Sequence, residues 1–190
     1  EDTDNDFLTF DCGSVTSDLA MSELFGHTKG AFTGAQKDKD GILIKADNRM
    51  IFLHEIGNLP MNGQKSLLRF IYDNELRPVG STEIKKINAQ VIAATNRNIN
   101  DSTIFAQDLK DRFGEIIDLP PLRERKKDIP LLIDHFINKY SDHPLILDQE
   151  IIEYLIHRSW EGNIRELEKW IKRLVRRFPK GGKLSISDIP

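Results

Sequence analysis

The sequence predicts an α/β fold, in which a mostly parallel sheet lies between helices and is followed by a small subdomain made only of helices. Short apolar runs that end in polar residues alternate with helix-like segments up to Pro121. Strands that alternate with helices favour a parallel sheet covered on both sides. After Pro121, amphipathic helices that begin at capping residues replace the apolar runs. We therefore divide the chain into residues 1–121, an α/β subdomain, and residues 122–190, a helical subdomain.

The first two strands are predicted at residues 7–10 and 50–53, with a helix between them that ends near Phe25. The second run is continuously apolar, which is typical of a strand buried on both faces. It ends at the acidic Glu55. Ligands of such sheets lie outside the carboxyl ends of the strands, so Glu55 is a candidate for chemistry.

A helix is predicted over residues 64–76, because its leucines and isoleucine recur on one face. A further buried strand is predicted over residues 89–95, and it ends in Asn96 and Arg97. Residues 116–119 resemble one more strand, which Pro120 and Pro121 would close.

Three helices are predicted in the second part. Asp128 can cap a helix that runs to Tyr140, and Asp148 can cap a second one. Asn163 can cap the third, with Glu166 placed three residues later as in a capping box. The third helix carries apolar residues at helical spacing, which indicate core packing: Leu167, Trp170, Ile171, Leu174 and Phe178.

Composition is nearly balanced in charge, with 27 basic and 30 acidic side chains, so it does not by itself require a nucleic-acid partner. Basic residues gather between Arg165 and Lys183, where eight of them accompany two glutamates. We interpret this cluster as the solvated face of a terminal helix; direct duplex binding is the alternative. The single cysteine, Cys12, lies in an apolar run and is expected to be a core residue of a cytoplasmic protein. No apolar stretch approaches the roughly 20 residues of a membrane span.

One segment has an unusual composition for a solvent-exposed loop. Residues 23–35 include Gly30 and Gly34, which give a flexible excursion, and Phe32, which places a large apolar ring at its tip. An exposed aromatic ring on a mobile loop usually marks a binding surface. The alternative is an ordinary turn with Phe32 folded inward.

This segment resembles the polymerase-contacting loop of sigma-54-dependent activators, the bacterial enhancer-binding proteins. Further stretches are similar to other motifs of that family: residues 53–60 to the Walker B strand, 94–97 to sensor I, 119–125 to the junction with the lid, and 160–167 to sensor II. The resemblance implies an AAA+ P-loop-type fold with a helical lid, a ring that is usually a hexamer, and ATP with Mg²⁺ between neighbouring subunits. It also implies contact with the sigma-54 RNA polymerase holoenzyme through Gly30, Ala31, Phe32, Thr33, Gly34 and Ala35.

The resemblance assigns chemistry to four further residues. Glu55 would orient the attacking water, and Arg112 would serve as an arginine finger across a subunit boundary. Asn96 would sense the terminal phosphate, and Arg165 would contact the nucleotide from the lid. In the family, DNA recognition belongs to a separate C-terminal domain that lies outside this chain.

The ATP chemistry is where the sequence departs from the family. The chain has no phosphate-binding glycine loop, which the family places before Phe7, so we expect a fragment that begins after that loop. His54 replaces the Walker B aspartate, Ala106 replaces a second arginine finger, and Asp11 replaces an asparagine that restrains the catalytic glutamate. Imidazole is a poor ligand for Mg²⁺, and no second histidine has metal-ligand spacing, so no metal site is predicted.

Two hypotheses of different class therefore stand. The first is an ATPase that couples hydrolysis to remodelling of sigma-54 RNA polymerase. The second is a degenerate module that binds sigma-54 or partner subunits without effective hydrolysis.

Overall fold

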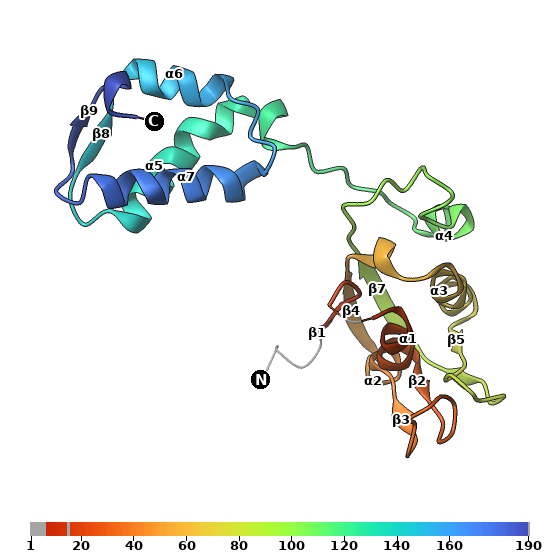
Figure 1. Cartoon of the computed structure of the whole chain (residues 1–190). Coiled ribbons are helices and arrows are strands. Elements are labelled where there is room, and N and C mark those ends of the chain that lie inside the picture. Colours follow the sequence, from red (N-terminus) through yellow and green to blue (C-terminus); the bar gives the residue numbers. More distant parts are fainter. Residues whose placement is uncertain (1–6, 15, 190) are drawn as a thin grey trace. The chain divides into compact units, whose positions relative to one another are not determined.

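A computed structural model describes residues 7–14 and 16–189 of the chain. The chain forms two compact units, one ending at Ile116 and the other beginning at Ile117 (Figure 1). Sequence analysis placed this boundary after residue 121. Each unit has its own apolar core, and each is described separately below. None of the described helices is long and apolar enough to cross a membrane.

The first unit is built on a three-stranded parallel sheet. Its strands are β1 (Phe7–Asp11), β4 (Arg49–His54) and β7 (Ala89–Ala93), and β4 lies in the centre. The predicted strands at residues 7–10, 50–53 and 89–95 are therefore confirmed, with small changes at their ends. Because all three strands are parallel, their carboxyl ends lie at the same edge of the sheet.

Four helices pack against this sheet: α1 (Ser17–Phe25), α2 (Ile42–Lys45), α3 (Met61–Asp73) and α4 (Gln107–Arg112). A short 3₁₀ turn, η2 (Ile56–Asn58), joins β4 to α3. Helix α3 begins and ends three residues before the predicted range. It stops at Asn74, which adopts a left-handed conformation at φ 57°, so Leu76 lies in a strand instead.

The helices cover one face of the sheet. Alternate strand residues such as Ile51, Leu53 and Val91 pack in the core with these helices. On the other face, Phe7 and Ile92 are 45% and 42% exposed. Residues 50–53 are therefore less buried than expected on this face, where Met50 and Phe52 are only partly buried, while Ile51 and Leu53 are fully buried on the other. The run is continuously apolar because apolar side chains also occupy the less buried face of β4.

Two short antiparallel excursions extend from this unit. In the first, β2 (Gly26–His27) pairs with β3 (Lys39–Asp40), and the loop between them contains residues 28–38. In the second, β5 (Glu75–Leu76) pairs with β6 (Lys85–Lys86). A salt bridge of 2.9 Å between Lys85 Nζ and Asp40 Oδ1 connects the two excursions.

Residues 116–119 do not form a strand, so that prediction is wrong. Ile117 and Leu119 are 76% and 82% exposed, and residues 115–121 have no regular structure. An apolar run becomes a strand only when a neighbouring strand accepts its backbone hydrogen bonds. No described strand pairs with this run.

The second unit begins with two 3₁₀ turns, η3 (Leu122–Glu124) and η4 (Lys126–Asp128). Its helices are α5 (Ile129–Tyr140), α6 (Gln149–His157) and α7 (Asn163–Arg177). The three predicted helices are confirmed, but the unit is not made only of helices. Strands β8 (Leu145–Leu147) and β9 (Gly182–Leu184) pair in parallel, and the turn η5 (Ile186–Asp188) follows them.

The predicted caps of these helices differ in outcome. Asp148 caps α6 as expected, since its carboxylate accepts a hydrogen bond from the Ile151 N–H at 2.9 Å. Asp128 precedes α5 without a side-chain cap bond. The prediction for α7 is wrong, because Gly162 occupies the cap position. Asn163 instead accepts a hydrogen bond from the Leu122 N–H at 2.8 Å and ties the first turn of the unit to α7.

Candidate functional site: the loop between β2 and β3 and a polar cavity at the sheet edge

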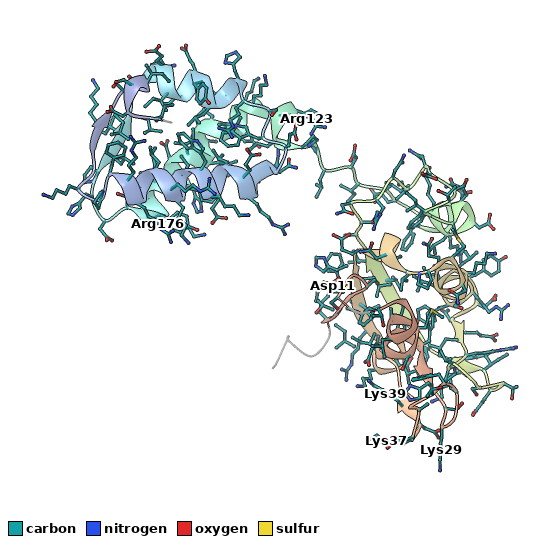
Figure 2. The ribbon with its side chains drawn as sticks, in the orientation of Figure 1. Asp11, Lys29, Lys37, Lys39, Arg123 and Arg176 are labelled. Atoms are coloured by element: carbon teal, nitrogen blue, oxygen red, sulfur yellow. The ribbon has the colours of Figure 1, made fainter. Side chains whose placement is uncertain are left out.

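The loop between β2 and β3 is a compact turn held by its own backbone. The Gly30 N–H donates to the Ala35 carbonyl at 2.8 Å, and the Ala35 N–H donates to the Phe32 carbonyl at 3.0 Å. Gly30 and Gly34 have φ of 82° and 100°, which glycine adopts without strain. The positive φ at both positions gives a physical reason for the two glycines. Lys29, Lys37 and Lys39 gather at the end of this excursion (Figure 2).

Phe32 is exposed at the surface of the loop, and its ring packs against a histidine. Its side chain is 39% exposed, and its ring lies edge-on to His27 with centroids 4.9 Å apart. His27 Nδ1 in turn lies 2.6 Å from the hydroxyl of Ser22, a buried residue of α1. Of the other predicted contact residues, Thr33 is exposed, whereas Ala35 is buried and anchors the loop. Sequence analysis missed the support that Ser22 and His27 provide.

The turn of the second excursion lies directly against this loop. The Thr28 N–H donates to the Val79 carbonyl at 3.0 Å, and the Val79 N–H donates to the Gly26 carbonyl at 2.9 Å. Gly80 has φ 79°, and a Cβ there would come within 2.7 Å of the Ala31 Cβ. The close approach of the two loops therefore requires a glycine at position 80. Sequence analysis assigned no role to this turn.

Replacing Gly80 with alanine is expected to displace the loop. An alanine with positive φ costs roughly 1–3 kcal/mol, and the steric conflict with Ala31 adds to this cost. We expect lower stability against urea and faster amide hydrogen exchange across residues 28–36. Gly114→Ala is the matched control, because a Cβ at Gly114 meets nothing within 4 Å. Equal exchange and equal stability in the two variants would contradict the predicted contact.

A polar cavity of about 590 Å³ lies at the carboxyl ends of the sheet strands. Each strand ends at or just before one of its lining residues, as expected for ligand sites in parallel sheets. The cavity is lined by Asp11, Gly13, Glu55, Asn58, Asn96 and Arg97. The structure thus brings three predicted residues to one place: Asp11, Glu55 and Asn96.

Glu55 occupies a strained position in this cavity. It is a left-handed residue at φ 54° between β4 and η2, and its Oε2 atom is buried without a hydrogen-bond partner among the described residues. Strained non-glycine residues and unsatisfied buried polar atoms both cost free energy, and they gather at functional sites. Burial, together with the negative charges of Asp11 and Glu55, raises the pKa of the neighbouring Cys12 thiol to about 12. Cys12 is a core residue, as predicted.

Arg97 joins the ends of β4 and β7 across the cavity. Its Nε and Nη2 atoms donate to Asn58 Oδ1 at 3.2 and 3.0 Å. A Cβ at Gly57 would come within 2.9 Å of the Arg97 side chain, so a glycine there permits this close packing. Sequence analysis assigned no role to Asn58 or Arg97. Their spacing does not reveal the pair, because 39 residues separate them.

The described residues do not fit a bound Mg²⁺. His54 is the register partner of Asp11 on the neighbouring strand, is exposed, and packs its ring edge-on to Phe52 at 4.3 Å. No group of three metal-ligating side chains occurs among the residues that the structure describes. Mg²⁺ favours several oxygen ligands in octahedral geometry, and an imidazole at position 54 does not supply one.

The two positions that the resemblance assigns to arginine fingers lie at the ends of α4, and neither lines the cavity. Ala106 precedes the helix, and its N–H donates to the buried Gln64 Oε1 at 2.8 Å, so this position anchors α4. Arg112 is exposed, and its guanidinium lies over the Tyr72 ring at 4.8 Å. It lines a separate groove between α3 and α4. Arg165 lies in the second unit, exposed in the first turn of α7.

Comparison with known proteins agrees with this arrangement. A model of the Sigma-54 interaction domain matches residues 1–117, and a model of the AAA+ ATPase lid domain matches residues 123–190. The chain belongs to the Sigma-54 interaction domain family. Members of this family that resemble the chain include the transcriptional regulatory protein ZraR of Salmonella typhimurium, which is 40% identical over 181 residues. The DNA-binding transcriptional regulator NtrC of Rhizobium meliloti is 38% identical over 181 residues.

The Sigma-54 interaction domain shared with these proteins is part of longer chains. The matches with ZraR and NtrC include 91% and 92% of this chain. They include only 41% of the length of ZraR and 37% of the length of NtrC. A crystal structure of NtrX from Brucella abortus in complex with ADP superposes with a TM-score of 0.79 at 25% identity. That match covers 98% of this chain and 43% of NtrX, and it confirms the predicted AAA+ fold.

Proposed function

We propose that this chain is the sigma-54-contacting domain of a transcription regulator and couples ATP binding and hydrolysis to remodelling of sigma-54 RNA polymerase. The observation that carries the proposal is the exposed Phe32, presented on a loop that is held from two sides. His27 supports the ring, and the turn at Val79 and Gly80 supports the loop backbone. A rigidly supported, exposed aromatic ring is the type of residue that dominates binding energy in protein interfaces.

The coupling follows from the path of the chain between cavity and loop. Strand β1 ends at Asp11 in the cavity, and α1 then leads directly to β2 at the base of the loop. Helix α1 has nine residues and is about 14 Å long. Its Ser22 contacts His27, which contacts Phe32. A ligand that moves the cavity end of α1 would therefore also move the support of Phe32.

The nucleotide site in this proposal uses residues of the cavity and, by resemblance, of partner subunits. Glu55 would hold and orient a water through its buried, unpartnered Oε2 atom. Asn96 would donate a hydrogen bond to the terminal phosphate. Arg112 would supply positive charge across a subunit boundary of the ring, and Arg165 would contact the nucleotide from the lid. No step is assigned to Mg²⁺, because His54 does not fit it.

A second candidate function is binding of sigma-54 or partner subunits without effective ATP hydrolysis. Two observations favour it. His54 packs on Phe52 where the family has a magnesium-supporting aspartate, and Ala106 anchors α4 where the family has a second arginine.

ATP turnover by the full-length protein separates the two candidates. The coupling proposal expects turnover that Glu55→Gln lowers by at least about 100-fold, because the water loses its orienting carboxylate. Binding of sigma-54 in the absence of nucleotide is measured in parallel and should be equal in the two proteins. Turnover indistinguishable from that of the Glu55→Gln variant, with sigma-54 binding retained, would establish the second candidate. Absence of sigma-54 binding by both proteins would contradict the coupling proposal and would limit the second candidate to binding of partner subunits.

A further inference from the structure

Helix α7 and the segment after it carry an uninterrupted series of cations. Between Lys169 and Ser187 the sequence contains no acidic residue. All seven basic side chains of this stretch are exposed. We call them the α7 stripe: Lys169, Lys172, Arg173, Arg176, Arg177, Lys180 and Lys183. Arg176 is labelled in Figure 2, where the second unit is seen with its side chains.

The stripe lies opposite the face that packs the unit. Its helical members are Lys169, the pair Lys172–Arg173 and the pair Arg176–Arg177, and each lies three or four residues from a member one turn away, which places them on one side of α7. Buried Leu167, Ile171 and Leu174 form the other side. The apolar residues of the helix pack in or against the core, whereas the charged ends of the stripe lie outside it. Two of these cations lie over aromatic rings, Lys172 over Tyr140 at 4.9 Å and Arg177 over Phe178 at 5.7 Å.

The stripe is also free of internal ion pairs. The two acidic residues of α7 are engaged elsewhere, since Glu166 pairs with Arg158 at 3.2 Å and Glu168 pairs with Lys139 at 2.9 Å. Within the residues that the structure describes, no member of the stripe lies within 4.0 Å of a carboxylate oxygen. The second unit carries fourteen basic and twelve acidic residues, so its small positive charge is concentrated on this stripe.

The composition of the stripe distinguishes between kinds of partner. Protein interfaces are centred on exposed apolar or aromatic side chains and are depleted in lysine. None of the large exposed apolar residues lies on α7. Rows of lysine and arginine without apolar residues are instead typical of contacts with nucleic-acid phosphates. From Lys169 to Arg177 the helix rises about 12 Å, which corresponds to about three to four base-pair steps along the DNA axis.

We propose that the α7 stripe binds the phosphate backbone of duplex DNA without sequence specificity. The family of this chain consists of transcription regulators, so promoter DNA is present where it acts. A contact of this kind would hold the lid against DNA in addition to any separate DNA-binding domain. It uses no residue of the loop or the cavity, so its failure would leave the proposed function untouched.

The test is binding of the 190-residue chain to a fluorescent duplex of about 30 base pairs at several salt concentrations. The variant replaces Lys169, Arg173 and Arg176 with glutamine. We expect the affinity at roughly 50 mM salt to fall at least tenfold, and the slope of log K against log salt to decrease in magnitude by about 3. Two unrelated duplex sequences should bind equally well.

A matched control removes the same number of charges elsewhere. Lys45, Lys126 and Lys127 are exposed and lie outside the stripe, and their replacement by glutamine should change the salt slope by less than about 1. Equal losses in the two triple variants would show a general charge effect and overturn the proposal. Absence of duplex binding by the unmodified chain, or stripe-dependent binding of a polyglutamate peptide without duplex binding, would overturn it as well. Circular dichroism confirms that both variants are folded.

Discussion

Replacing Phe32 with alanine is expected to weaken sigma-54 binding by about 2 kcal/mol or more, roughly thirtyfold, with little loss of stability. The Phe32 side chain is 39% exposed in the free chain and contacts His27, so more than a third of its surface is available to a partner. Truncation removes that surface, and the loop backbone remains closed by the Gly30–Ala35 and Ala35–Phe32 backbone hydrogen bonds. The measurement is the dissociation constant for purified sigma-54, by calorimetry or fluorescence anisotropy.

Tyr72→Ala is the matched control for this variant. Tyr72 is also an exposed aromatic residue, 67% exposed on α3, and it lies outside the loop. We expect its removal to change sigma-54 affinity by less than about threefold, as for most surface positions. An equal effect of the two substitutions would remove the reason to assign the contact to Phe32.

Replacing Trp160 with alanine is expected to have the largest effect on stability, about 3–5 kcal/mol, confined to the second unit. Trp160 is fully buried, and its indole N–H donates to the Leu155 carbonyl at 2.7 Å. Truncation leaves a large cavity in a small core and removes the hydrogen-bond donor to the Leu155 carbonyl. Both changes lower the free energy of unfolding of the second unit. Hydrogen exchange of the full chain measures the free energy of opening separately for α5–α7 and for the sheet.

Trp170→Ala provides the comparison, because Trp170 lies on the same unit and is only partly buried. Its loss should cost less than half as much. Since the two units have separate cores, sheet amides should exchange at unchanged rates in both variants. A uniform loss of protection across β1, β4 and β7 would show that the two units unfold together.

The parts of the fold that could be predicted are those that local patterns determine. Alternation of apolar runs with helical segments located β1, β4, β7 and the three long helices of the second unit. Asp148 was recognised as a cap because capping depends on residues within one turn. The glycines of the loop were likewise interpretable, because positive φ is a property of single residues.

The parts that could not be predicted depend on contacts between distant segments. Strands β8 and β9 are short, and a parallel pair has no hairpin turn to indicate it. Residues 116–119 have the composition of a strand, but no described strand pairs with them. Arg97 and Asn58 meet because β4 and β7 are neighbours in the sheet. The support of the loop by Gly80 arises in the same way, from two excursions that leave the unit side by side.

Hydrogen exchange with and without sigma-54 tests most directly the central claim that the loop between β2 and β3 contacts sigma-54. The claim predicts that sigma-54 slows amide exchange across residues 28–36 and, through the Thr28–Val79 bonds, at residues 78–81. It predicts no change on α6 or β8, which lie in the other unit. Protection confined to the second unit or to the exposed face of the sheet, with residues 28–36 unchanged, would contradict it.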